Sequence, residues 1–215
     1  PKTGHTKLDV VRYYESVAEP LLAALGGRPL LLERYPEGAG GKSFFQKRVP
    51  KTAPSWLETT VVETPNGTTS DALVAADLAH IVWGVNQGCI GFHVWPYHAK
   101  TPEFVDELRI DLDPSDENSF GDAIEVALAC RELLAEWDWP SFAKTSGGRG
   151  IHVFVPIHPQ HSFVDVRHAA IAIGRELERR LPHLVTMSWW KEERGPRVFV
   201  DFNQNAQDRV MASAY

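Results

Sequence analysis

With 215 residues, of which 43% are hydrophobic and 23% are charged, the chain has an ordinary globular composition and can bury a sizeable core. Its net charge of −6 excludes a general polyanion-binding surface, so any contact with nucleic acid has to come from local basic clusters. There is no signal peptide and no apolar run of about 18 residues, so we expect a cytoplasmic protein without a membrane span. Cys89 and Cys130 have apolar neighbours and no metal-ligand spacing, which favours small buried thiols in a reducing compartment.

The first part of the chain predicts helices and strands in alternation. Thr6, with Asp9 three residues on, begins a helix that we expect to kink at Pro20 and to end at Gly26-Gly27. Ser70 is expected to cap a helix from Asp71 to about Asn86. The expected strands are residues 29–35, 59–64 and 89–95, with a hairpin turn over 65–68.

The second part also interleaves strands and helices, without a regular βαβ cadence. This order predicts an α+β fold with mixed and antiparallel sheets, in one domain or one domain of two lobes spanning 1–215. Because the sequence starts at Pro1 and stops at Tyr215 inside an apolar run, we expect a longer parent chain. The expected strands are 108–114, 142–145, 151–156 and 197–202, and the expected helices are 119–137 and 164–181.

Two carboxylates share one face of the strand that ends at Pro114. Asp111 and Asp113 alternate with apolar residues, which places both on the face away from the core. Like charges this close repel each other unless a cation or a shared proton offsets the repulsion. Asp201 has the same placement on the last strand, and three carboxylates suit two hard cations such as Mn²⁺ or Mg²⁺. The competing interpretations are a turn or cap at Asp113 and a surface ion pair of Asp201 with Arg194 or Arg197.

A glycine-rich loop follows the strand at 142–145. Its three glycines within residues 147–150 can turn backbone N–H groups toward a phosphate, and Ser146, Arg149 and His152 add donors. The spacing is not that of a Walker loop. The alternative is a glycine-rich hairpin with His152 as an ordinary strand residue.

Three further positions could contact a ligand. His93 lies on the polar face of its expected strand, and Arg194 in the loop before the last strand could reach a phosphate or be solvated. Phe44 and Phe45 beside Lys47 have the composition of a stacking platform for nucleic-acid bases, although a strand with one core Phe explains half of that pattern.

As a set and in this order, these motifs resemble the polymerase domain of bacterial ligase D and its stand-alone relatives, within the archaeo-eukaryotic primase superfamily. The resemblance spans essentially the whole chain. Glu33 stands beside Arg34 where some relatives carry lysine. The matching segments are Thr3-Gly4-His5-Thr6-Lys7-Leu8-Asp9, Phe44-Phe45-Gln46-Lys47, Phe92-His93-Val94, Asp111-Leu112-Asp113-Pro114, Thr145-Ser146-Gly147-Gly148-Arg149-Gly150-Ile151-His152 and Val198-Phe199-Val200-Asp201-Phe202-Asn203-Gln204-Asn205.

The resemblance implies a primase-polymerase fold, with sheets forming a catalytic cleft flanked by helices, and roles for single residues. Two divalent ions, Mn²⁺ or Mg²⁺, would be held by the three carboxylates. Two residues would contact the incoming nucleotide near its ribose, and three would bind the triphosphate. Four would contact DNA, one of them at a 5′-phosphate. The ions would be held by Asp111, Asp113 and Asp201. The residues near the ribose would be His93 and Ser146, and those at the triphosphate would be Arg149, His152 and Arg194. The DNA contacts would be Phe44, Phe45, Lys47 and, at the 5′-phosphate, Lys7.

The implied activity is that of a template-dependent nucleotidyltransferase. It would add NTPs or dNTPs to a primer 3′-hydroxyl at gaps or double-strand-break ends during bacterial non-homologous end joining. The implied partners are gapped or broken DNA with a 5′-phosphate, a fused or separate DNA ligase and an end-binding protein of the Ku type. The alternatives are a stand-alone primase-polymerase outside end joining and a non-catalytic DNA-end-binding module. A metal-dependent nuclease would use three carboxylates but would not need the triphosphate-binding set.

Overall fold

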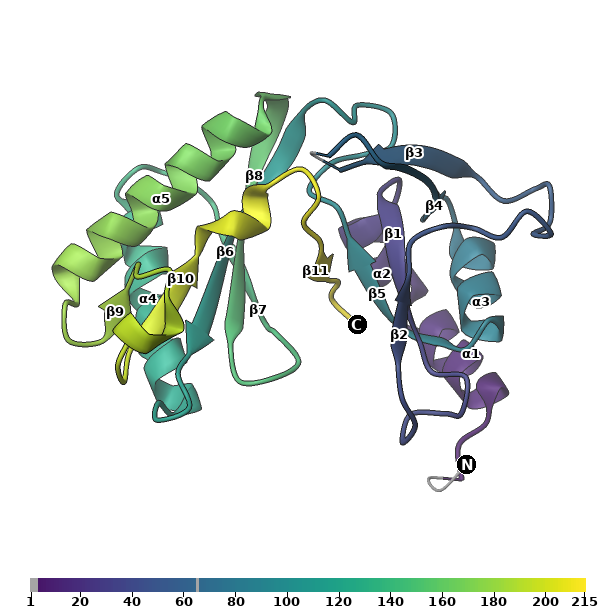
Figure 1. The fold of residues 1–215 in the computed structure, drawn as a ribbon, viewed down its shortest axis with the longest axis horizontal. Coiled ribbons are helices and arrows are strands. Elements are labelled where there is room, and N and C mark those ends of the chain that lie inside the picture. Colours follow the sequence, from purple (N-terminus) through teal and green to yellow (C-terminus); the bar gives the residue numbers. More distant parts are fainter. Residues whose placement is uncertain (1–3, 65) are drawn as a thin grey trace. The chain divides into compact units, whose positions relative to one another are not determined.

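The structure, a computed structural model, describes residues 4–64 and 66–215. They form two compact units: Pro1–Pro102 with Val210–Tyr215 (unit 1), and Glu103–Arg209 (unit 2). Each unit has one sheet and its own helices (Figure 1), which confirms the α+β prediction. Thr3 of the first motif and Pro65 of the expected turn lie outside the described residues.

The sheet of unit 1 has the strand order β11-β5-β1-β4-β3, with β2 also paired to β1. The pairs of β1 with its three neighbours are all antiparallel, and a β-bulge lies at Glu33/Arg34 where β1 meets β5. These strands are β1 (Pro29–Arg34), β2 (Phe44–Gln46), β3 (Thr59–Glu63), β4 (Thr69–Val74), β5 (Cys89–Val94) and β11 (Met211–Ala212).

Three helices cover one face of this sheet: α1 (Lys7–Ser16), α2 (Ala18–Leu25) and α3 (Leu78–Asn86). Thr6 and Asp9 form the expected capping box of α1. The expected kink at Pro20 is wrong, because the helix breaks at Val17 and Pro20 lies in the first turn of α2. A proline there removes only an N–H group that has no partner within the helix.

The expected helix over residues 71–86 is also wrong in its first half. Thr69–Val74 is strand β4, paired with β3, and the helix begins only after Asp77. Asp77 is the actual N-cap, since its carboxylate accepts a hydrogen bond from the His80 backbone N–H at 3.2 Å and lies 2.7 Å from the His80 ring. The apolar residues of β4 thus belong to a strand, whereas the prediction placed them in a helix.

The sheet of unit 2 has the strand order β7-β8-β6-β10-β9, with β6 at its centre. All neighbours pair antiparallel except β10 and β9, which are parallel. The strands are β6 (Val105–Pro114), β7 (Phe142–Thr145), β8 (Ile151–His161), β9 (Val185–Thr186) and β10 (Val198–Asp201), and two 3₁₀ turns are η1 (Lys191–Glu193) and η2 (Phe202–Asn205).

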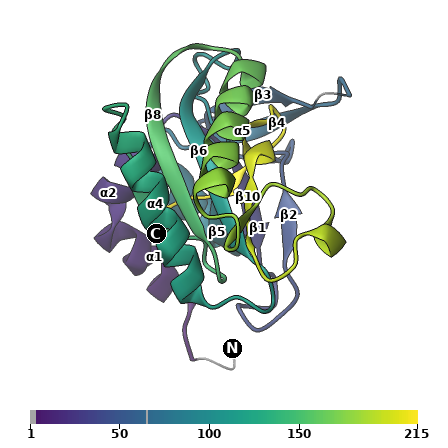
Figure 2. The ribbon, with the colours of Figure 1, turned by 90° about the vertical axis from the view of Figure 1, so that its left-hand side faces the viewer.

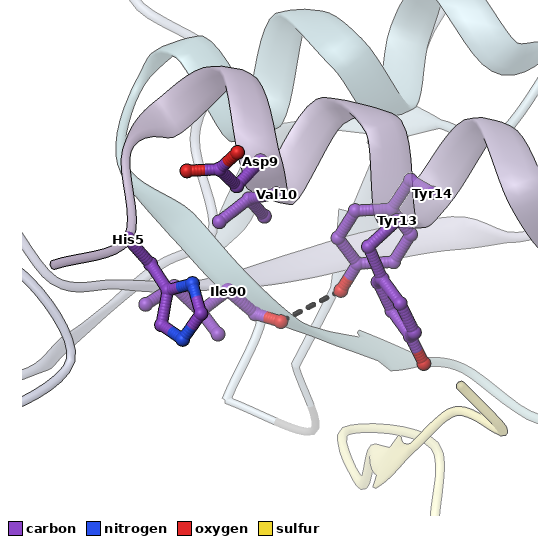
Figure 3. Close-up of a pocket in the computed structure, with 6 residues that line it drawn as sticks. All are labelled: His5, Asp9, Val10, Tyr13, Tyr14 and Ile90. Atoms are coloured by element: carbon purple, nitrogen blue, oxygen red, sulfur yellow. Dashed lines mark hydrogen bonds between the residues drawn. The ribbon is translucent and has the colours of Figure 1, made fainter. Parts of the chain in front are cut away.

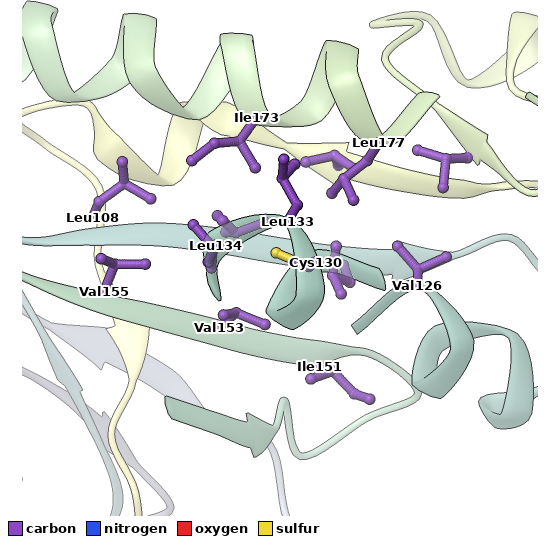
Figure 4. Packing of buried hydrophobic residues seen from close by; sticks show 14 of the residues in the cluster. Leu108, Val126, Cys130, Leu133, Leu134, Ile151, Val153, Val155, Ile173 and Leu177 are labelled. Carbon is purple, nitrogen blue, oxygen red and sulfur yellow. The ribbon is translucent and has the colours of Figure 1, made fainter. Parts of the chain in front are cut away.

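Helices α4 (Phe120–Ala135) and α5 (Phe163–Arg180) pack on the same face of this sheet and beside each other (Figure 2). Ser119 and Ser162 cap them through capping boxes with Asp122 and Asp165. Between helices and sheet lies one apolar core (Figure 4), formed by alternate residues of β6, β8 and β10: Leu108, Ile110, Leu112, Ile151, Val153, Val155, Val198 and Val200. The residues between them in the sequence therefore point to the opposite face.

The expectation of buried free cysteines is confirmed in the described residues. Cys89 and Cys130 are free, buried thiols, and burial raises the pKa of each to about 12. No helix among residues 4–64 and 66–215 is long and apolar enough to cross a membrane.

We predict that truncating the core beneath α5 destabilises unit 2 strongly. Leu177 is fully buried between α5 and the sheet, so Leu177→Ala should lower the free energy of unfolding by about 2–5 kcal/mol. Val164→Ala on the exposed side of the same helix is the control and should change it by less than about 0.5 kcal/mol. Urea unfolding measures both, and equal losses in the two variants would contradict this packing.

Candidate active site

The carboxylates predicted from the sequence lie together on the face of the unit 2 sheet opposite α4 and α5. Asp111 and Asp113 alternate with the buried Ile110 and Leu112 on β6, and Asp111 is the direct cross-strand partner of Asp201 on β10. Opposed residues of an antiparallel pair have Cβ atoms only about 4.5–5.5 Å apart. The core contacts of β6 thus hold the carboxylates of Asp111 and Asp201 side by side. The third carboxylate, that of Asp113, lies two residues further along β6.

Strand pairing extends this pair into a row across four strands. Asp111 is opposite His152 on β8, and His152 is opposite Lys144 on β7. The row therefore reads Lys144, His152, Asp111, Asp201. His152 is buried, with its Nε2 atom 3.5 Å from Asp111 Oδ1. The alternative of His152 as an ordinary strand residue does not account for this placement beside the acids.

Burial and neighbouring carboxylates raise the pKa of two of the three acids. Asp111 is only 8% exposed, and burial, followed by repulsion from Asp113 and Asp201, raises its pKa to about 8. Burial and then Asp201 also raise the pKa of Asp113, against the opposing charges of Arg194 and Arg149. Asp111 Oδ1 is buried and makes no hydrogen bond with the described residues. An oxygen of this kind is suited to a metal ion or a retained proton.

Asp201 is held in place by the turn that follows it. Its Oδ1 accepts a hydrogen bond from the Asn203 backbone N–H at 2.8 Å, and its Oδ2 accepts one from Gln204 Nε2 at 3.0 Å. Arg197, one of the two expected ion-pair partners, instead donates to the carbonyls of Arg194 and Glu193. Gln204, to which the resemblance assigns no role, thus orients the carboxylate of Asp201.

Three carboxylates on one sheet face supply the oxygen donors that Mg²⁺ and Mn²⁺ prefer. Their mutual repulsion and the unbonded oxygen of Asp111 fit a bound cation. Within the part of the chain that the structure describes, no three Asp, Glu, His or Cys side chains are close enough together to hold a metal ion.

The glycine-rich loop is closed by its own serine. Ser146 Oγ accepts hydrogen bonds from the backbone N–H groups of Gly148 and Gly150, at 3.2 and 3.1 Å, so these two amides already have a partner. Gly147 has a φ of +93°, and a Cβ at Gly150 would lie 2.5 Å from the Leu112 carbonyl oxygen. Glycine at position 150 thus lets the loop approach the strand that carries the acids, and brings Ser146 near Asp113.

Arg149 at the tip of this loop is bound to an acid that the sequence analysis did not single out. Its guanidinium NH2 lies 2.5 Å from Asp116 Oδ1, and Lys191 Nζ lies 3.5 Å from Asp116 Oδ2. The hydrogen bond from Arg149 and the charge of Lys191 lower the pKa of Asp116, which keeps this exposed carboxylate ionised. Asp116 thereby pairs with the guanidinium of Arg149, to which a phosphate could otherwise bind.

Arg194 is fixed by stacking as well as by hydrogen bonds. Its guanidinium carbon lies 3.5 Å from the centroid of the Phe199 ring, and its Nε and NH2 atoms donate to the carbonyls of Ser188 and Trp189. A cation held flat on an aromatic face loses little side-chain entropy when it binds an anion. Of the two alternatives for Arg194, the structure excludes a merely solvated side chain.

His93 and Phe45 of unit 1 lie on the sheet face opposite α1–α3. Phe44 points to the other face of β2, where the guanidinium carbon of Arg34 lies 5.2 Å from the centroid of its ring. His93 lies at 3.4 Å from Glu33, and its ring meets the ring of Phe45 edge to face at 5.1 Å. Phe44 and Phe45 are 46% and 56% exposed, which leaves aromatic surface for stacking. Lys47 Nζ lies 5.7 Å from the centroid of the Trp95 ring.

Lys7 lies apart from these residues and has a structural contact. Its Nζ donates to the Asn86 carbonyl at 2.7 Å, at the C-terminal end of α3, where a positive charge is favoured. Next to it along α1 is a shallow pocket (Figure 3), in which the Tyr14 hydroxyl donates to the Ile90 carbonyl at 2.7 Å. The pocket is lined by His5, Asp9, Val10, Tyr13, Tyr14 and Ile90.

Lys144 is the site residue that the sequence analysis left without a role. It is half-buried, and burial lowers its pKa while the charge of Asp111 partly compensates. The alternation in 142–145 could have placed it on the same face as His152, but its position beside Asp111 follows only from the pairing of β7, β8 and β6.

Comparison with known proteins confirms the fold and the family resemblance. The solved polymerase domain of Mycobacterium tuberculosis ligase D, in complex with DNA, matches with a TM-score of 0.90 and 31% identity, covering 100% of this chain and 77% of that one. The class of protein is therefore a primase-polymerase. A family model described as the LigD primase-polymerase domain matches residues 6–215, and the chain belongs to that family.

Two curated relatives are much longer than this chain. The multifunctional non-homologous end joining DNA repair protein LigD of M. tuberculosis is 33% identical over 223 residues, and LigD of Pseudomonas aeruginosa is 30% identical over 216 residues. Both alignments cover 100% of this chain, but only 29% and 26% of those proteins. The chain thus spans less than a third of their length.

We predict that Asp111 makes the metal-free protein less stable as the pH rises. Its pKa is about 8 in the folded chain against about 3.9 when unfolded, so folding retains a proton that the unfolded chain releases between these values. Stability from this group is present at low pH and is lost as the pH rises toward 8. Asp111→Asn removes the titration, so its stability relative to the wild type should increase by about 1–3 kcal/mol from pH 5 to pH 8.

Urea unfolding with a chelator present measures this trend. Asp116→Asn is the matched control, because the pKa of the exposed Asp116 is lowered and its titration lies below pH 5. A difference between wild type and Asp111→Asn that stays constant from pH 5 to pH 8 would show that Asp111 is ionised throughout.

Proposed function

We propose that this chain is a template-dependent nucleotidyltransferase that adds NTPs or dNTPs to a primer 3′-hydroxyl at DNA gaps and double-strand-break ends. The observation that carries the proposal is the set of Asp111, Asp113 and Asp201 on one sheet face, next to Arg149 and Arg194, in a chain of the LigD primase-polymerase family. We further propose that residues 1–215 act as one catalytic domain.

The three carboxylates would hold two Mn²⁺ or Mg²⁺ ions, which when bound would activate the primer hydroxyl and stabilise the leaving pyrophosphate. The chain's own part is to set the position and charge of these acids. Asp111 must give up a proton to bind a cation, because its pKa lies near 8. Gln204 would keep the carboxylate of Asp201 aimed along the face, and Lys144 and His152 would balance charge on the other side of Asp111.

The triphosphate of the nucleotide would bind to Arg149, His152 and Arg194. Arg194 is the most rigid of these, as Phe199 and two backbone carbonyls hold it. Arg149 would have to exchange Asp116 for a phosphate oxygen, which a surface ion pair allows at little cost. His93 together with Ser146 would contact the nucleotide near its ribose.

The DNA would contact unit 1 through local features, as the net charge of −6 requires. Phe44 and Phe45 would stack on template bases with Lys47 at the backbone. Lys7 would bind a 5′-phosphate by releasing the Asn86 carbonyl.

The names of the relatives suggest the cellular setting. LigD proteins of M. tuberculosis and P. aeruginosa are named for non-homologous end joining, and the solved ligase D polymerase domain binds DNA. We propose that this chain acts in the same repair process at the bacterial nucleoid, with a fused or separate DNA ligase and a Ku-type end-binding protein. The alternatives remain a stand-alone primase-polymerase outside end joining and a non-catalytic module that binds DNA ends.

We predict that removing one acid abolishes extension but not DNA binding. With Mn²⁺ and NTPs or dNTPs on gapped DNA, Asp113→Ala should lower primer extension by at least roughly 10³-fold, since this carboxylate would hold the ions. Its affinity for the same DNA in a fluorescence anisotropy titration should stay within about twofold. Asp71→Ala, which removes an exposed carboxylate on β4, is the control and should extend normally.

Each outcome of this experiment bears on one alternative. Full extension by Asp113→Ala would overturn the assignment of the acids, and DNA binding without extension by the wild type would favour the end-binding module. Equal activity on gapped DNA with and without a 5′-phosphate would favour the stand-alone primase-polymerase.

We predict that Asp116 competes with the triphosphate for Arg149. Asp116→Asn should lower KM for NTPs by roughly twofold to threefold with little change in kcat, because the exposed ion pair contributes only modestly. Steady-state extension kinetics measure this effect. Glu117→Gln removes one exposed negative charge next to it and is the control; an equal fall in KM there would indicate a general charge effect.

A further inference from the structure

Glu33 is a carboxylate in unit 1 that neither the motifs nor the proposed chemistry accounts for. It lies on β1, opposite Phe45 on β2 and opposite Gly91 on β5. The neighbouring residue on the same face, Leu31, is opposite His93. Glu33 is therefore placed diagonally to His93 on the face opposite the helices, within reach of a long side chain.

The two oxygens of Glu33 have different partners, which fixes the plane of the carboxylate. The Tyr35 hydroxyl donates to Oε1 at 2.7 Å, and His93 Nε2 lies 3.4 Å from Oε2. The side chains of both Glu33 and His93 are mostly buried, with 22% and 18% exposed. A partly buried pair of this kind is screened by water less than a surface pair.

The adjacent strand leaves room for this carboxylate by having no side chain. A Cβ at Gly91 would lie 2.8 Å from Glu33 Oε2 and 3.4 Å from Glu33 Cβ, so the carboxylate would have to shift from its present position. Glycine at this position therefore keeps the space in which Glu33 reaches His93 open. The arrangement involves three strands and Tyr35, and it is not the contact of one flexible surface side chain.

The charge of Glu33 decides which atom carries the proton. Burial alone would raise its pKa, but hydrogen bonds from Tyr35 and His93 outweigh burial and leave the pKa below its usual value. An ionised carboxylate only accepts hydrogen bonds, so His93 Nε2 has to be the donor. In a neutral imidazole the other ring nitrogen, Nδ1, then has the character of an acceptor.

We propose that Glu33 is a positioning residue for His93, which holds the ring by accepting the Nε2–H and so makes Nδ1 the acceptor atom of the ring. This rests on the proposed function, in which His93 contacts the incoming nucleotide. An acceptor suits a sugar hydroxyl, which can donate, and does not suit an ionised phosphate oxygen. The negative charge of Glu33 also disfavours phosphate there, so Glu33 and His93 define the sugar end of the nucleotide site.

The first test examines the ring in the nucleotide-free protein. ¹⁵N–¹H NMR of labelled histidine at pH 8 should show His93 predominantly as the Nε2–H tautomer in the wild type. Glu33→Gln should shift that population toward Nδ1–H, because the amide cannot accept from both Tyr35 and His93 at full strength. Glu63→Gln, an exposed position on β3 of the same sheet with the same charge change, should leave the spectrum unchanged.

The second test measures the consequence for nucleotide use. Glu33→Gln should raise KM for NTPs by roughly fivefold to twentyfold while kcat changes less than about twofold, as expected when a ligand contact is misaligned before the chemical step. Tyr35→Phe, which removes only the second support of Glu33, should raise KM in the same direction by roughly twofold. Glu63→Gln should keep the wild-type KM.

The two readouts separate this proposal from the proposed function. If the wild type does not extend primers, the proposed function fails, while the NMR result still decides whether Glu33 sets the His93 tautomer. A predominantly Nδ1–H ring in the wild type, or an unchanged KM in Glu33→Gln, would overturn the positioning role.

Discussion

The pairing register of β6 is the constraint on which the candidate site depends. Side chains alternate between faces, so a slip of one residue would bury Asp111 against α4 and α5 and turn Leu108, Ile110 and Leu112 outward. The burial of that apolar set against α4 and α5 makes such a slip prohibitively costly. The same contacts that stabilise unit 2 thus place Asp111 opposite Asp201 on one side and opposite His152 on the other.

Holding the acids close together costs electrostatic free energy, and basic side chains on the same sheet face partly offset this cost. Burial and the charges of Asp113 and Asp201 raise the pKa of Asp111, and a histidine and a lysine continue the same row. The cations at the edge are held in different ways, since Arg194 is stacked on Phe199 and Arg149 is paired with Asp116. Arg194 and Arg149 thus have partners within the protein, and a nucleotide would have to displace Asp116 from Arg149.

Much of the fold could be predicted from the sequence, because the decisive signals are local. The alternation around Asp111 and Asp113 gave the correct face, and Thr6 and Ser119 marked helix starts by capping boxes. The prediction of a helix from Asp71 was wrong for two reasons. A short apolar run such as that of β4 is compatible with either a helix or a buried strand. In addition, the helix is capped by Asp77, six residues later in the sequence. The placement of Lys144 beside Asp111, and of Glu33 beside His93, depends on pairing between strands far apart in the sequence, and no local pattern encodes it.

The central claim is that the three carboxylates of unit 2 form a cation site whose formation requires Asp111 to lose a proton. Calorimetric titration of Mn²⁺ into the protein at pH 7, in two buffers of different protonation enthalpy, tests it most directly. We expect Mn²⁺ to bind with release of about one proton, because a group with a pKa near 8 is mostly protonated at this pH. Asp111→Asn should lose both the binding and the proton release. Binding of equal strength in Asp111→Asn, or binding by the wild type without proton release, would contradict the account.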